Sequence, residues 1–157
     1  MENQNQLLTL CIIKEESRIL LGMKKRGFGE GRWNGFGGKV QASENIKEAA
    51  KREVLEESNV VLKNLEEVGI LNFEFEGKLG ILEVHIFKGT EFSGEPRESE
   101  EMRPRWFSLK EIPYDQMWPD DRYWLPLFLA DKKFKGSYLF GAGDSILKSE
   151  LKEVKEI

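Results

Sequence analysis

The chain opens with two short runs of apolar residues that predict a pair of strands. Residues 7–13 and residues 18–23 are mostly aliphatic, and the polar residues 14–17 separate them. Apolar runs of this length between polar turn residues are typical of β-strands. We therefore expect two strands within the first 23 residues.

Further strands are predicted in the middle of the chain. Hydrophobic and polar residues alternate over residues 71–76, residues 77–80 have the composition of a turn, and residues 81–87 resume the alternation. This is the pattern of a β-hairpin. Residues 91–104 are polar, acidic and bounded by proline, which predicts a long surface loop of the kind that lines functional sites. Residues 105–108 are expected to add a short strand.

A helix and a hairpin are predicted for the last third of the chain. Pro119 suits the first position of a helix that runs to about residue 133. Asp120 and Asp121 then fall in its first turn and Lys132 and Lys133 in its last turn, which matches the helix dipole. Pro126 predicts a kink in this helix. Residues 134–154 have the pattern of a hairpin, with a helical end as the alternative.

The composition describes one globular domain of 157 residues. A chain of this length buries roughly 68–70% of its extended surface, which supports a single core and a single domain over residues 1–157. The net charge of −4 argues against a nucleic-acid partner. The longest mostly apolar run, residues 7–13, is too short to span a membrane, and no Lys or Arg of a signal peptide precedes it.

Single copies of cysteine and histidine remove whole classes of chemistry. Cys11 is the only cysteine, so an internal disulfide and a cysteine metal cage are excluded, and we expect a small buried side chain in a reducing compartment. His85 is the only histidine and sits within a predicted strand. A two-histidine zinc site is therefore excluded, and a structural position for His85 is favoured.

A glycine-rich stretch leads into the first predicted helix. Six glycines fall within residues 27–38, directly after the three cations of residues 24–26. A helical pattern follows over about residues 45–58, with Asn45 as N-cap and Glu48 at capping-box spacing. Glycines let backbone groups approach phosphates and metals closely, so this loop indicates a polyphosphate ligand.

Three carboxylates lie on one face of that helix. Glu53, Glu56 and Glu57 fall within an arc of roughly 100°. Like charges at this spacing destabilise a helix unless a positive charge lies among them, and Mg²⁺ or Mn²⁺ is the simplest one. The alternative is a solvated face that Lys51 and Arg52 neutralise, with Arg52 and Glu56 as an i,i+4 pair.

The spacing of these residues resembles the signature of the Nudix hydrolases. Asn59 stands where the family has glycine, and asparagine tolerates the left-handed conformation that ends a helix. The resemblance implies an α/β fold, an α/β/α sandwich around a mixed β-sheet, and Mg²⁺-dependent hydrolysis of a nucleoside diphosphate linked to another group, with Mn²⁺ as the alternative cation. The matched positions are Gly38, Glu44, Arg52, Glu53, Val54, Glu56, Glu57 and Val60.

Segments outside this signature resemble the MutT-type oxidised purine nucleoside triphosphatases of animals. This closer likeness runs from about residue 7 to the C-terminal hairpin. It implies hydrolysis of 8-oxo-dGTP, 2-hydroxy-dATP and 8-oxo-dATP to the monophosphate and pyrophosphate, which keeps oxidised purines out of DNA. The segments that carry it are residues 21–29, 32–40, 101–104 and 117–121.

The resemblance also implies the residues of the site. The metal ligands are the Gly37 carbonyl and the carboxylates of Glu53, Glu56, Glu57 and Glu101, which are also the catalytic residues, with Glu57 the favoured general base and Glu101 its alternative. Glu44 and Arg52 are expected to orient them. The substrate-binding residues are Thr9, Lys24, Phe28, Asn34, Phe36, Gly37, Gly38, Lys39, Phe73, Met102, Trp118, Pro119, Asp120, Asp121 and Trp124.

The resemblance implies that four residues around the purine determine specificity for the base, namely Asn34, Trp118, Asp120 and Asp121. Guanine N1–H and N2–H₂ are donors that suit a carboxylate, and two adjacent buried carboxyls tend to share a proton. Such a pocket accepts both oxidised guanine and oxidised adenine. The structural alternatives are that the two aspartates only stabilise a helix N-terminus and that Trp118 and Phe73 are ordinary core residues.

Two other functions stay open at this point. One is a Nudix hydrolase of a different nucleoside diphosphate derivative, and the other is a noncatalytic nucleotide-binding module. We expect the protein to be a monomer with a small nucleotide as its partner and no nucleic acid or membrane. The expected location is the cytoplasm, with mitochondrial or nuclear pools as alternatives.

Overall fold

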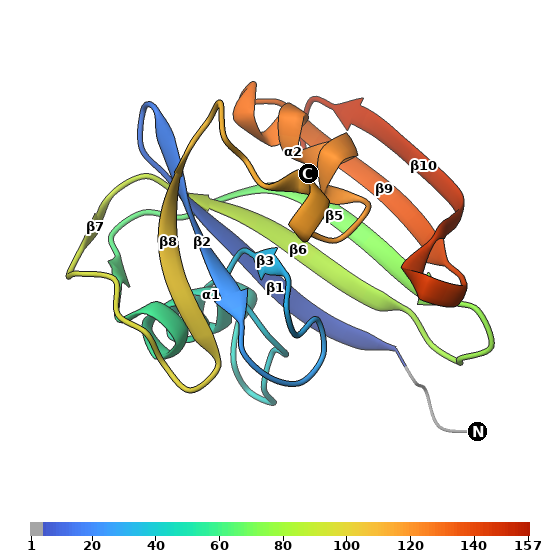
Figure 1. Ribbon diagram of the computed structural model, residues 1–157, viewed down its shortest axis with the longest axis horizontal. Coiled ribbons are helices and arrows are strands. Elements are labelled where there is room, and N and C mark those ends of the chain that lie inside the picture. The colour runs from blue at the N-terminus through green and yellow to red at the C-terminus, as the bar shows by residue number, and fades with distance from the viewer. Residues whose placement is uncertain (1–4) are drawn as a thin grey trace.

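The computed structural model describes residues 5–157 and folds them around one large sheet (Figure 1). Two α-helices and two short 3₁₀-helices accompany ten strands in the described part of the chain. The elements are β1 Gln6–Lys14, β2 Arg18–Lys24, β3 Trp33–Asn34, α1 Ile46–Ser58, β4 Val61–Leu62, β5 Glu66–Phe75, β6 Leu82–Gly89, β7 Phe92–Ser93, β8 Met102–Ser108, η1 Tyr114–Gln116, α2 Asp121–Leu129, β9 Lys133–Phe140, η2 Ala142–Asp144 and β10 Ile146–Val154.

The large sheet is mixed and has eight strands. Its order is β10-β9-β5-β6-β1-β2-β3, and β8 also pairs with β2. The pairs β1–β6 and β5–β9 are parallel, whereas the others in this sheet are antiparallel. Strands β4 and β7 form a small separate sheet. Parallel pairing brings strands together that are far apart in the sequence, so the centre of the sheet depends on long-range contacts.

Two apolar clusters cover the two faces of this sheet. On one face, Cys11 and Phe36 pack with Val54 of α1, and all three are fully buried. On the other face, Ile12 packs with Trp124 of α2. Because successive residues of a strand point to opposite faces, neighbours such as Cys11 and Ile12 enter different clusters. A helix on each face of a mixed sheet is the predicted α/β/α sandwich, which is confirmed.

Most predicted elements are confirmed. The first two strands are β1 and β2, the middle hairpin is β5–β6, and the C-terminal hairpin is β9–β10. The Asn45 side chain accepts a hydrogen bond of 2.8 Å from the backbone N–H of Glu48, as its N-cap position predicts. Asn59 ends α1 in the left-handed conformation, with φ of 67°. Cys11 is buried, which raises the pKa of its thiol to about 12.

Two sequence predictions were wrong in their bounds. Residues 91–104 are only partly a loop, because β7 occupies Phe92–Ser93 and β8 begins at Met102. The second helix is shorter than predicted, since α2 spans Asp121–Leu129 and Lys133 already belongs to β9. Pro119 therefore lies outside the helix.

The early end of α2 has a tertiary cause. Lys88 of β6 is buried and donates hydrogen bonds to the Phe128 carbonyl at 2.8 Å and to the Asp131 carboxylate at 2.7 Å. Asp131 adopts a positive φ of 59°, which turns the chain out of the helix. The cation at the helix C-terminus thus comes from a distant strand and not from Lys132 and Lys133.

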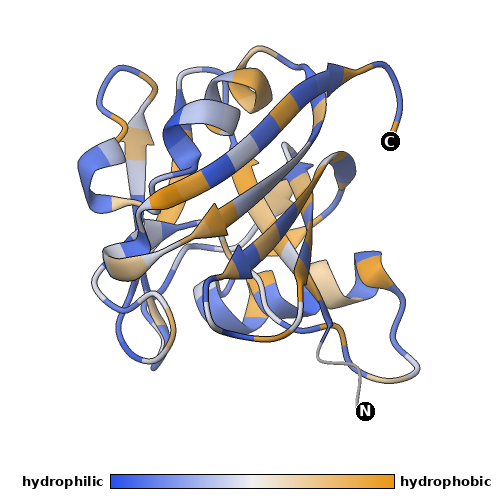
Figure 2. Ribbon diagram, turned by 90° about the vertical axis from the view of Figure 1, so that its right-hand side faces the viewer, coloured by the Kyte–Doolittle hydropathy of each residue, from blue (hydrophilic) through white to orange (hydrophobic). Residues whose placement is uncertain are grey.

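The C-terminal strand forms an edge of the sheet. Figure 2 shows β10 banded along its length, with hydrophilic residues between a few hydrophobic ones. Charged side chains on an edge strand discourage pairing with another chain. Among the residues that the structure describes, no helix is long and apolar enough to cross a membrane.

Candidate active site

One cavity of about 570 Å³ connects the glycine loop, α1 and the start of α2. It is lined by Gly37 and Gly38 of the loop, Glu57 of α1, and Asp120 and Asp121 at the start of α2. We call Glu53, Glu56, Glu57 and Glu101 the glutamate cluster, and Asp120 with Asp121 the aspartate pair. A cavity of this volume, mostly apolar and with few polar groups, is typical of a small-molecule site.

Glu57 is the most buried member of the glutamate cluster, with 5% of its surface exposed. Its Oε1 accepts a hydrogen bond of 2.8 Å from the Gly37 backbone N–H. Burial raises the pKa of Glu57 to about 7, and the charges of Glu53 and Glu101 add to the rise, while the Gly37 N–H and Lys24 oppose it. The side chain thus combines access to the cavity with a pKa suited to proton transfer near neutrality.

The two loop glycines lie in close contact with neighbouring groups, the backbone of Thr9 at Gly37 and the carboxylate of Glu53 at Gly38. A Cβ atom on Gly37 would lie 1.8 Å from the Thr9 carbonyl oxygen, and one on Gly38 would lie 2.7 Å from Glu53 Oε1. Any side chain at Gly38 would therefore displace the Glu53 carboxylate. Burial raises the pKa of Glu53, although its hydrogen bond from Arg52 counteracts the rise.

Arg52 holds the outer part of the cluster in place. Its Nε and Nη2 donate to the Glu44 carboxylate at 2.6 and 3.0 Å, and its Nη1 donates to Glu53 at 2.9 Å and Glu56 at 3.3 Å. Hydrogen bonding to Arg52 lowers the pKa of Glu44. The predicted i,i+4 pair between Arg52 and Glu56 is present, and Arg52 also relieves the repulsion between neighbouring carboxylates.

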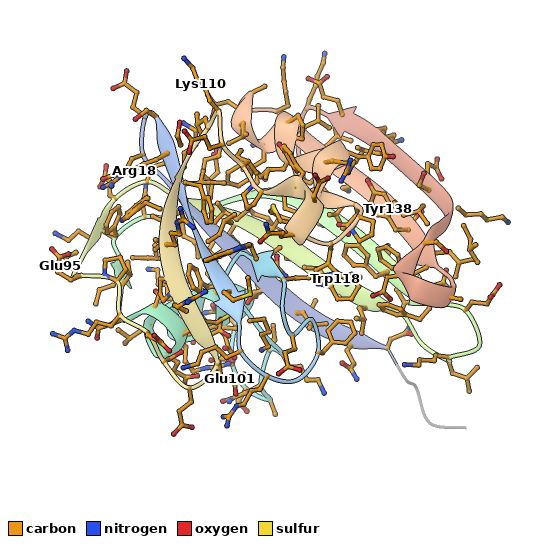
Figure 3. The ribbon with its side chains drawn as sticks, in the orientation of Figure 1. Arg18, Glu95, Glu101, Lys110, Trp118 and Tyr138 are labelled. Atoms are coloured by element: carbon orange, nitrogen blue, oxygen red, sulfur yellow. The ribbon has the colours of Figure 1, made fainter. Side chains whose placement is uncertain are left out.

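Glu101 lies on the loop before β8 and is held by cations (Figure 3). Lys24 Nζ lies 3.0 Å from its Oε2, and Arg26 Nη2 lies 2.9 Å from its Oε1. These hydrogen bonds, from Lys24 first, lower the pKa of Glu101. Glu56 is likewise turned to Arg52, so no three acidic or other ligand side chains of residues 5–157 converge into a ready-made metal site.

The donor set nevertheless fits a hard divalent cation. Glu53 and Glu57 approach the Gly37–Gly38 segment from one helix. Burial first, and then the charges of Glu53 and Glu101, raise the pKa of Glu57. Carboxylate and carbonyl oxygens are the ligands that Mg²⁺ and Mn²⁺ prefer. A positive ion among these carboxylates would relieve their mutual repulsion. The glutamate cluster therefore fits a divalent metal ion by its donor atoms and by its charge.

The aspartate pair lies in an apolar environment, and each residue is 3% exposed. Asp120 Oδ2 accepts a hydrogen bond of 2.7 Å from the indole Nε1 of Trp124. Burial raises the pKa of both carboxyls, and the charge of Asp120 raises that of Asp121 further. Asp120 is the N-cap residue of α2 but makes no capping hydrogen bond with its side chain, and Asp121 lies in the first turn of the helix.

Aromatic rings form one wall of the cavity. The Trp118 ring lies 5.1 Å from Phe28 and 5.6 Å from Phe140, measured between ring centroids. The Arg32 guanidinium lies 4.2 Å from the centroid of Trp118 and pairs with Asp144 at 2.9 Å. Trp118 therefore packs against the protein and lines the cavity at once, and flat rings of this kind suit the face of a base.

The structure brings most of the predicted site residues to this cavity. Phe36 instead lies in the core beside α1, and Pro119 lines an adjoining outer cleft of about 1090 Å³. Glu53, Glu56 and Glu101 lie outside the cavity lining. The predicted residues that line it are Thr9, Lys24, Phe28, Asn34, Gly37, Gly38, Lys39, Glu57, Phe73, Met102, Trp118, Asp120, Asp121 and Trp124.

Much of the cavity wall is formed by residues that were not predicted from the sequence. Leu71, Phe73 and Phe75 share one face of β5, so the alternation that predicted the strand could also have predicted a continuous wall. The remaining missed residues belong to neighbouring strands and turns. The full set is Gln6, Leu8, Leu10, Gly29, Gly35, Leu71, Phe75, Lys78, Leu79, Gly80, Leu82, Val84, Ile86 and Phe140.

Comparison with known proteins places this geometry in a family. A model of the NUDIX domain matches residues 5–128. The chain is 50% identical over 153 residues to a Danio rerio protein named oxidized purine nucleoside triphosphate hydrolase, covering 98% of each chain. It is 53% identical over 150 residues to the Mus musculus protein of the same name, covering 96% of each. The crystal structure of a MutT protein from Bacillus halodurans has a TM-score of 0.84 and 31% identity, and the match covers 94% of this chain and 97% of that one. The chain therefore belongs to the Nudix family.

Proposed function

We propose that this protein hydrolyses oxidised purine nucleoside triphosphates to the monophosphate and pyrophosphate. The substrates are 8-oxo-dGTP, 2-hydroxy-dATP and 8-oxo-dATP, and their removal protects DNA from mutagenic nucleotides. The observation that carries the proposal is a single cavity that contains both the buried aspartate pair and Glu57 of the Nudix helix. The names of the zebrafish and mouse relatives, which match nearly the whole chain, support the same substrate class.

The apolar part of the cavity would hold the base. Trp118 and Phe28 offer aromatic faces, and the aspartate pair offers hydrogen-bonding groups within the same wall. Because burial raises the pKa of both carboxyls, the pair retains a proton to a higher pH than free aspartate does. One carboxyl then donates while the other accepts, and moving the proton between them lets one pocket bind oxidised guanine or oxidised adenine.

The polyphosphate would lie against the glycine loop. Lys24 lines the cavity beside Gly37 and Gly38, and its ammonium group faces Glu101. A triphosphate carries the charge that Lys24 and Arg26 attract. Binding of phosphate oxygens by these two cations would release Glu101 from its ion pairs.

Nudix hydrolases act with a divalent cation, and we assign Mg²⁺ here, with Mn²⁺ as the alternative. Glu53, Glu57 and the Gly37 carbonyl would hold it, joined by Glu56 and Glu101 once these leave their present partners. When bound, the cation neutralises phosphate charge and makes water a better nucleophile.

Glu57 is the residue that we assign to proton transfer. A water molecule attacks the phosphorus that carries the pyrophosphate group. The new P–O bond forms as the bond to the pyrophosphate breaks, and Glu57 accepts a proton from the water. Arg52 and Glu44 do not line the cavity and act by orienting the helix carboxylates. Glu101 is the alternative base.

The proposal extends to the molecular setting. We propose a single Nudix hydrolase domain that acts as a monomer on a small nucleotide, without nucleic acid or membrane, in the cytoplasm. The rival functions are hydrolysis of another nucleoside diphosphate derivative and noncatalytic nucleotide binding. The aspartate pair favours a purine-selecting pocket over the first, and the glutamate cluster favours catalysis over the second.

Product analysis tests this proposal directly. The protein is incubated with Mg²⁺ and, separately, dGTP, 8-oxo-dGTP, 2-hydroxy-dATP and a dinucleoside polyphosphate, and the products are separated by ion-exchange chromatography. We expect monophosphate and pyrophosphate, formed chiefly from the oxidised triphosphates, and none without metal. Turnover of the dinucleotide alone would replace the proposed substrate class. Folded protein with no turnover of any substrate would favour the binding module.

A further inference from the structure

Trp118 lies in a stretch of chain that belongs to no helix or strand. Residues 117–120 connect η1, which ends at Gln116, to α2, which begins at Asp121. The orientation of the Trp118 ring is therefore not set by regular secondary structure and depends on the side chains that it contacts. Because this ring lines the proposed base pocket, the contacts that hold it bear on how a base is bound.

The Arg32 side chain covers one face of the Trp118 indole. Its guanidinium carbon lies 4.2 Å from the ring centroid, within the distance of a cation–π contact, and Trp118 is labelled in Figure 3. Trp118 lines both the cavity and the outer cleft, whereas Arg32 lines only the outer cleft. The guanidinium therefore approaches the ring from its outer side and leaves the cavity side of the indole open to a ligand.

Arg32 is itself fixed by a residue of the C-terminal hairpin. Its Nη1 donates a hydrogen bond of 2.9 Å to Asp144 Oδ2, across 112 positions of the sequence. The two side chains are 27% and 35% exposed, so the ion pair is partly shielded from water. A charge-assisted hydrogen bond of this kind keeps the flat guanidinium in one orientation.

The turn that carries Asp144 is held in an uncommon conformation. Asp144 has a positive φ of 60°, which few residues other than glycine adopt. The Asp144 N–H donates to the Gly141 carbonyl at 3.0 Å, and the Gly141 N–H donates to the Ser145 carbonyl at 2.7 Å, so the turn is closed by its own backbone. A residue retained in such a conformation often has a local role, and here the turn presents the carboxylate to Arg32.

The loop of residues 27–32 also meets the edge of the indole. A Cβ atom on Gly29 would lie 3.2 Å from Trp118 Nε1. The loop thus contacts the ring at its Nε1 edge through Gly29 and on its outer face through Arg32. Phe28 of the same loop lies 5.1 Å from the ring but is 64% exposed, so Arg32 is the better shielded of the two side chains.

We propose that Arg32, fixed by Asp144, is a positioning residue that holds the Trp118 ring as a preformed stacking face for the base. The Arg32 side chain does not line the cavity, so it acts through Trp118 and not by touching the base. A ring that is already held in place loses less conformational freedom when the base binds, which strengthens binding. This inference rests on the proposed function, because the ligand is the purine base of that substrate.

Replacing Arg32 by alanine removes the support of the ring. The base should then stack less tightly, while the groups that act at phosphorus are unchanged. We expect Arg32→Ala to raise KM for 8-oxo-dGTP by about 3–10-fold and to leave kcat within about twofold of the wild type. The Kd of the product 8-oxo-dGMP, measured by calorimetry without metal, should rise by the same factor.

The two oxidised purines separate support of the ring from the charge of Arg32. A ring contacts the face of either purine, so KM for 8-oxo-dGTP and for 2-hydroxy-dATP should rise equally. Burial raises the pKa of Asp120 and Asp121, and the Arg32 charge opposes this rise. If Arg32 acted mainly through these carboxyls, the ratio of kcat/KM between the two substrates would change instead.

Asp144→Asn loosens Arg32 but leaves its charge in place. Asparagine tolerates a positive φ as aspartate does, so the turn is kept and the ionic part of the contact is lost. We expect KM for 8-oxo-dGTP to rise by about 2–3-fold. In an Arg32→Ala background, Asp144→Asn should add nothing, because the two residues act as one unit.

Arg122 and Asp115 provide the matched control. They form a pair of 3.1 Å that lines the same outer cleft, and their side chains are 47% and 96% exposed. Arg122→Ala should leave KM and kcat unchanged. In a Trp118→Leu background, Arg32→Ala should have no further effect, because the ring that it supports is gone.

A spectroscopic readout requires no turnover. The indole ¹⁵N–¹H resonance of Trp118 is assigned as the one that is absent from Trp118→Phe. We expect its {¹H}–¹⁵N nuclear Overhauser effect to fall in Arg32→Ala, because the ring gains freedom on the ps–ns timescale. The indole of Trp124 is buried and donates to Asp120 at 2.7 Å, so its signal should not change.

The outcomes are distinct. A folded Arg32→Ala protein with the KM and Kd of the wild type overturns the proposal, and so does a raised KM with an unchanged Trp118 signal. A change confined to one purine also overturns it, since Arg32 would then act through the aspartate pair. If the wild type hydrolyses neither oxidised triphosphate, the proposed function fails, whereas the indole signal of the free protein still decides whether Arg32 holds Trp118.

Discussion

The glutamate cluster and the aspartate pair are both buried acidic groups, but their surroundings differ. Around Glu57, a backbone N–H and Lys24 oppose the effect of burial on the pKa, and Arg52 binds the neighbouring Glu53. Around the aspartate pair the walls are aromatic and aliphatic, and one indole supplies the hydrogen bond. Burial raises pKa values in both groups, but the glutamate cluster is surrounded by more cations and donors that oppose the rise than the aspartate pair is.

The difference also appears in how each group is built. Three of the four glutamates come from one turn and a half of α1, with Arg52 on the same helix. The aspartates are adjacent in sequence, yet their environment comes from β9, α2, η1 and the β2–β3 loop. A charged site for phosphate chemistry can thus be set by local spacing, whereas a selective pocket needs the whole sheet.

The largest effect is expected from removing the Glu57 carboxylate. Glu57→Gln keeps an oxygen that can accept the Gly37 N–H but loses the base, so kcat should fall by roughly 10²–10⁴. Steady-state kinetics with 8-oxo-dGTP measures this, and Glu48→Gln, an exposed position on the same helix, is the matched control. A folded Glu57→Gln protein as active as the wild type would refute the assignment.

A smaller effect is expected when Glu53 is displaced without changing its charge. Gly38→Ala places a methyl group 2.7 Å from Glu53 Oε1, so this carboxylate has to move. Misplacement on this scale should lower kcat by about 10–100-fold. The loss should be equal for 8-oxo-dGTP and 2-hydroxy-dATP, because the aspartate pair is untouched. A loss confined to one base would show that the two acidic groups are not separate.

Asp120→Asn perturbs the other group. The amide oxygen can still accept the Trp124 indole N–H, but the residue can no longer exchange a proton with Asp121. We expect the ratio of kcat/KM between 8-oxo-dGTP and 2-hydroxy-dATP to change by about 10-fold. The measurement is kcat/KM for each substrate in the variant and in the wild type. An unchanged ratio between the two substrates would count against a pocket whose two aspartates share a proton.

The same contrast explains which features could be predicted from the sequence. Asn45, Asn59 and the acidic face of α1 follow from contacts within a few residues, so their pattern was sufficient. The wall of the cavity depends on the parallel pairing of β5 with β9, which no local pattern specifies. Lys88 ends α2 from a distant strand, and this is why the helix was predicted too long.

Ion pairs across the fold were equally hidden. Glu101 was expected beside the helix glutamates, and its contact with Lys24 joins residues 77 positions apart. Side-chain chemistry that depends on two distant elements needed the structure.

The smallest expected effect concerns stability. Burial raises the pKa of Asp121 in the folded protein above its unfolded value of about 3.9. At a pH between the unfolded and the folded pKa, the native state therefore holds more protons than the unfolded chain. Its contribution to stability is full below the unfolded pKa and is lost as the pH rises through the folded pKa. Asp121→Asn removes this loss, so the free energy of unfolding at pH 7.5 should rise by on the order of 1 kcal/mol, with no gain near pH 3.

Asp131 gives the opposite sign and serves as the comparison. It is exposed, and its hydrogen bond from Lys88 lowers its pKa. Its contribution is therefore present above the unfolded pKa and lost as the pH falls, so Asp131→Asn should cost a little stability at pH 7.5 and none at low pH. Denaturant unfolding of both variants across this range measures the two trends. If the Asp121→Asn curve instead runs parallel to that of the wild type, the pair does not store a proton and the contrast with the glutamate cluster is lost.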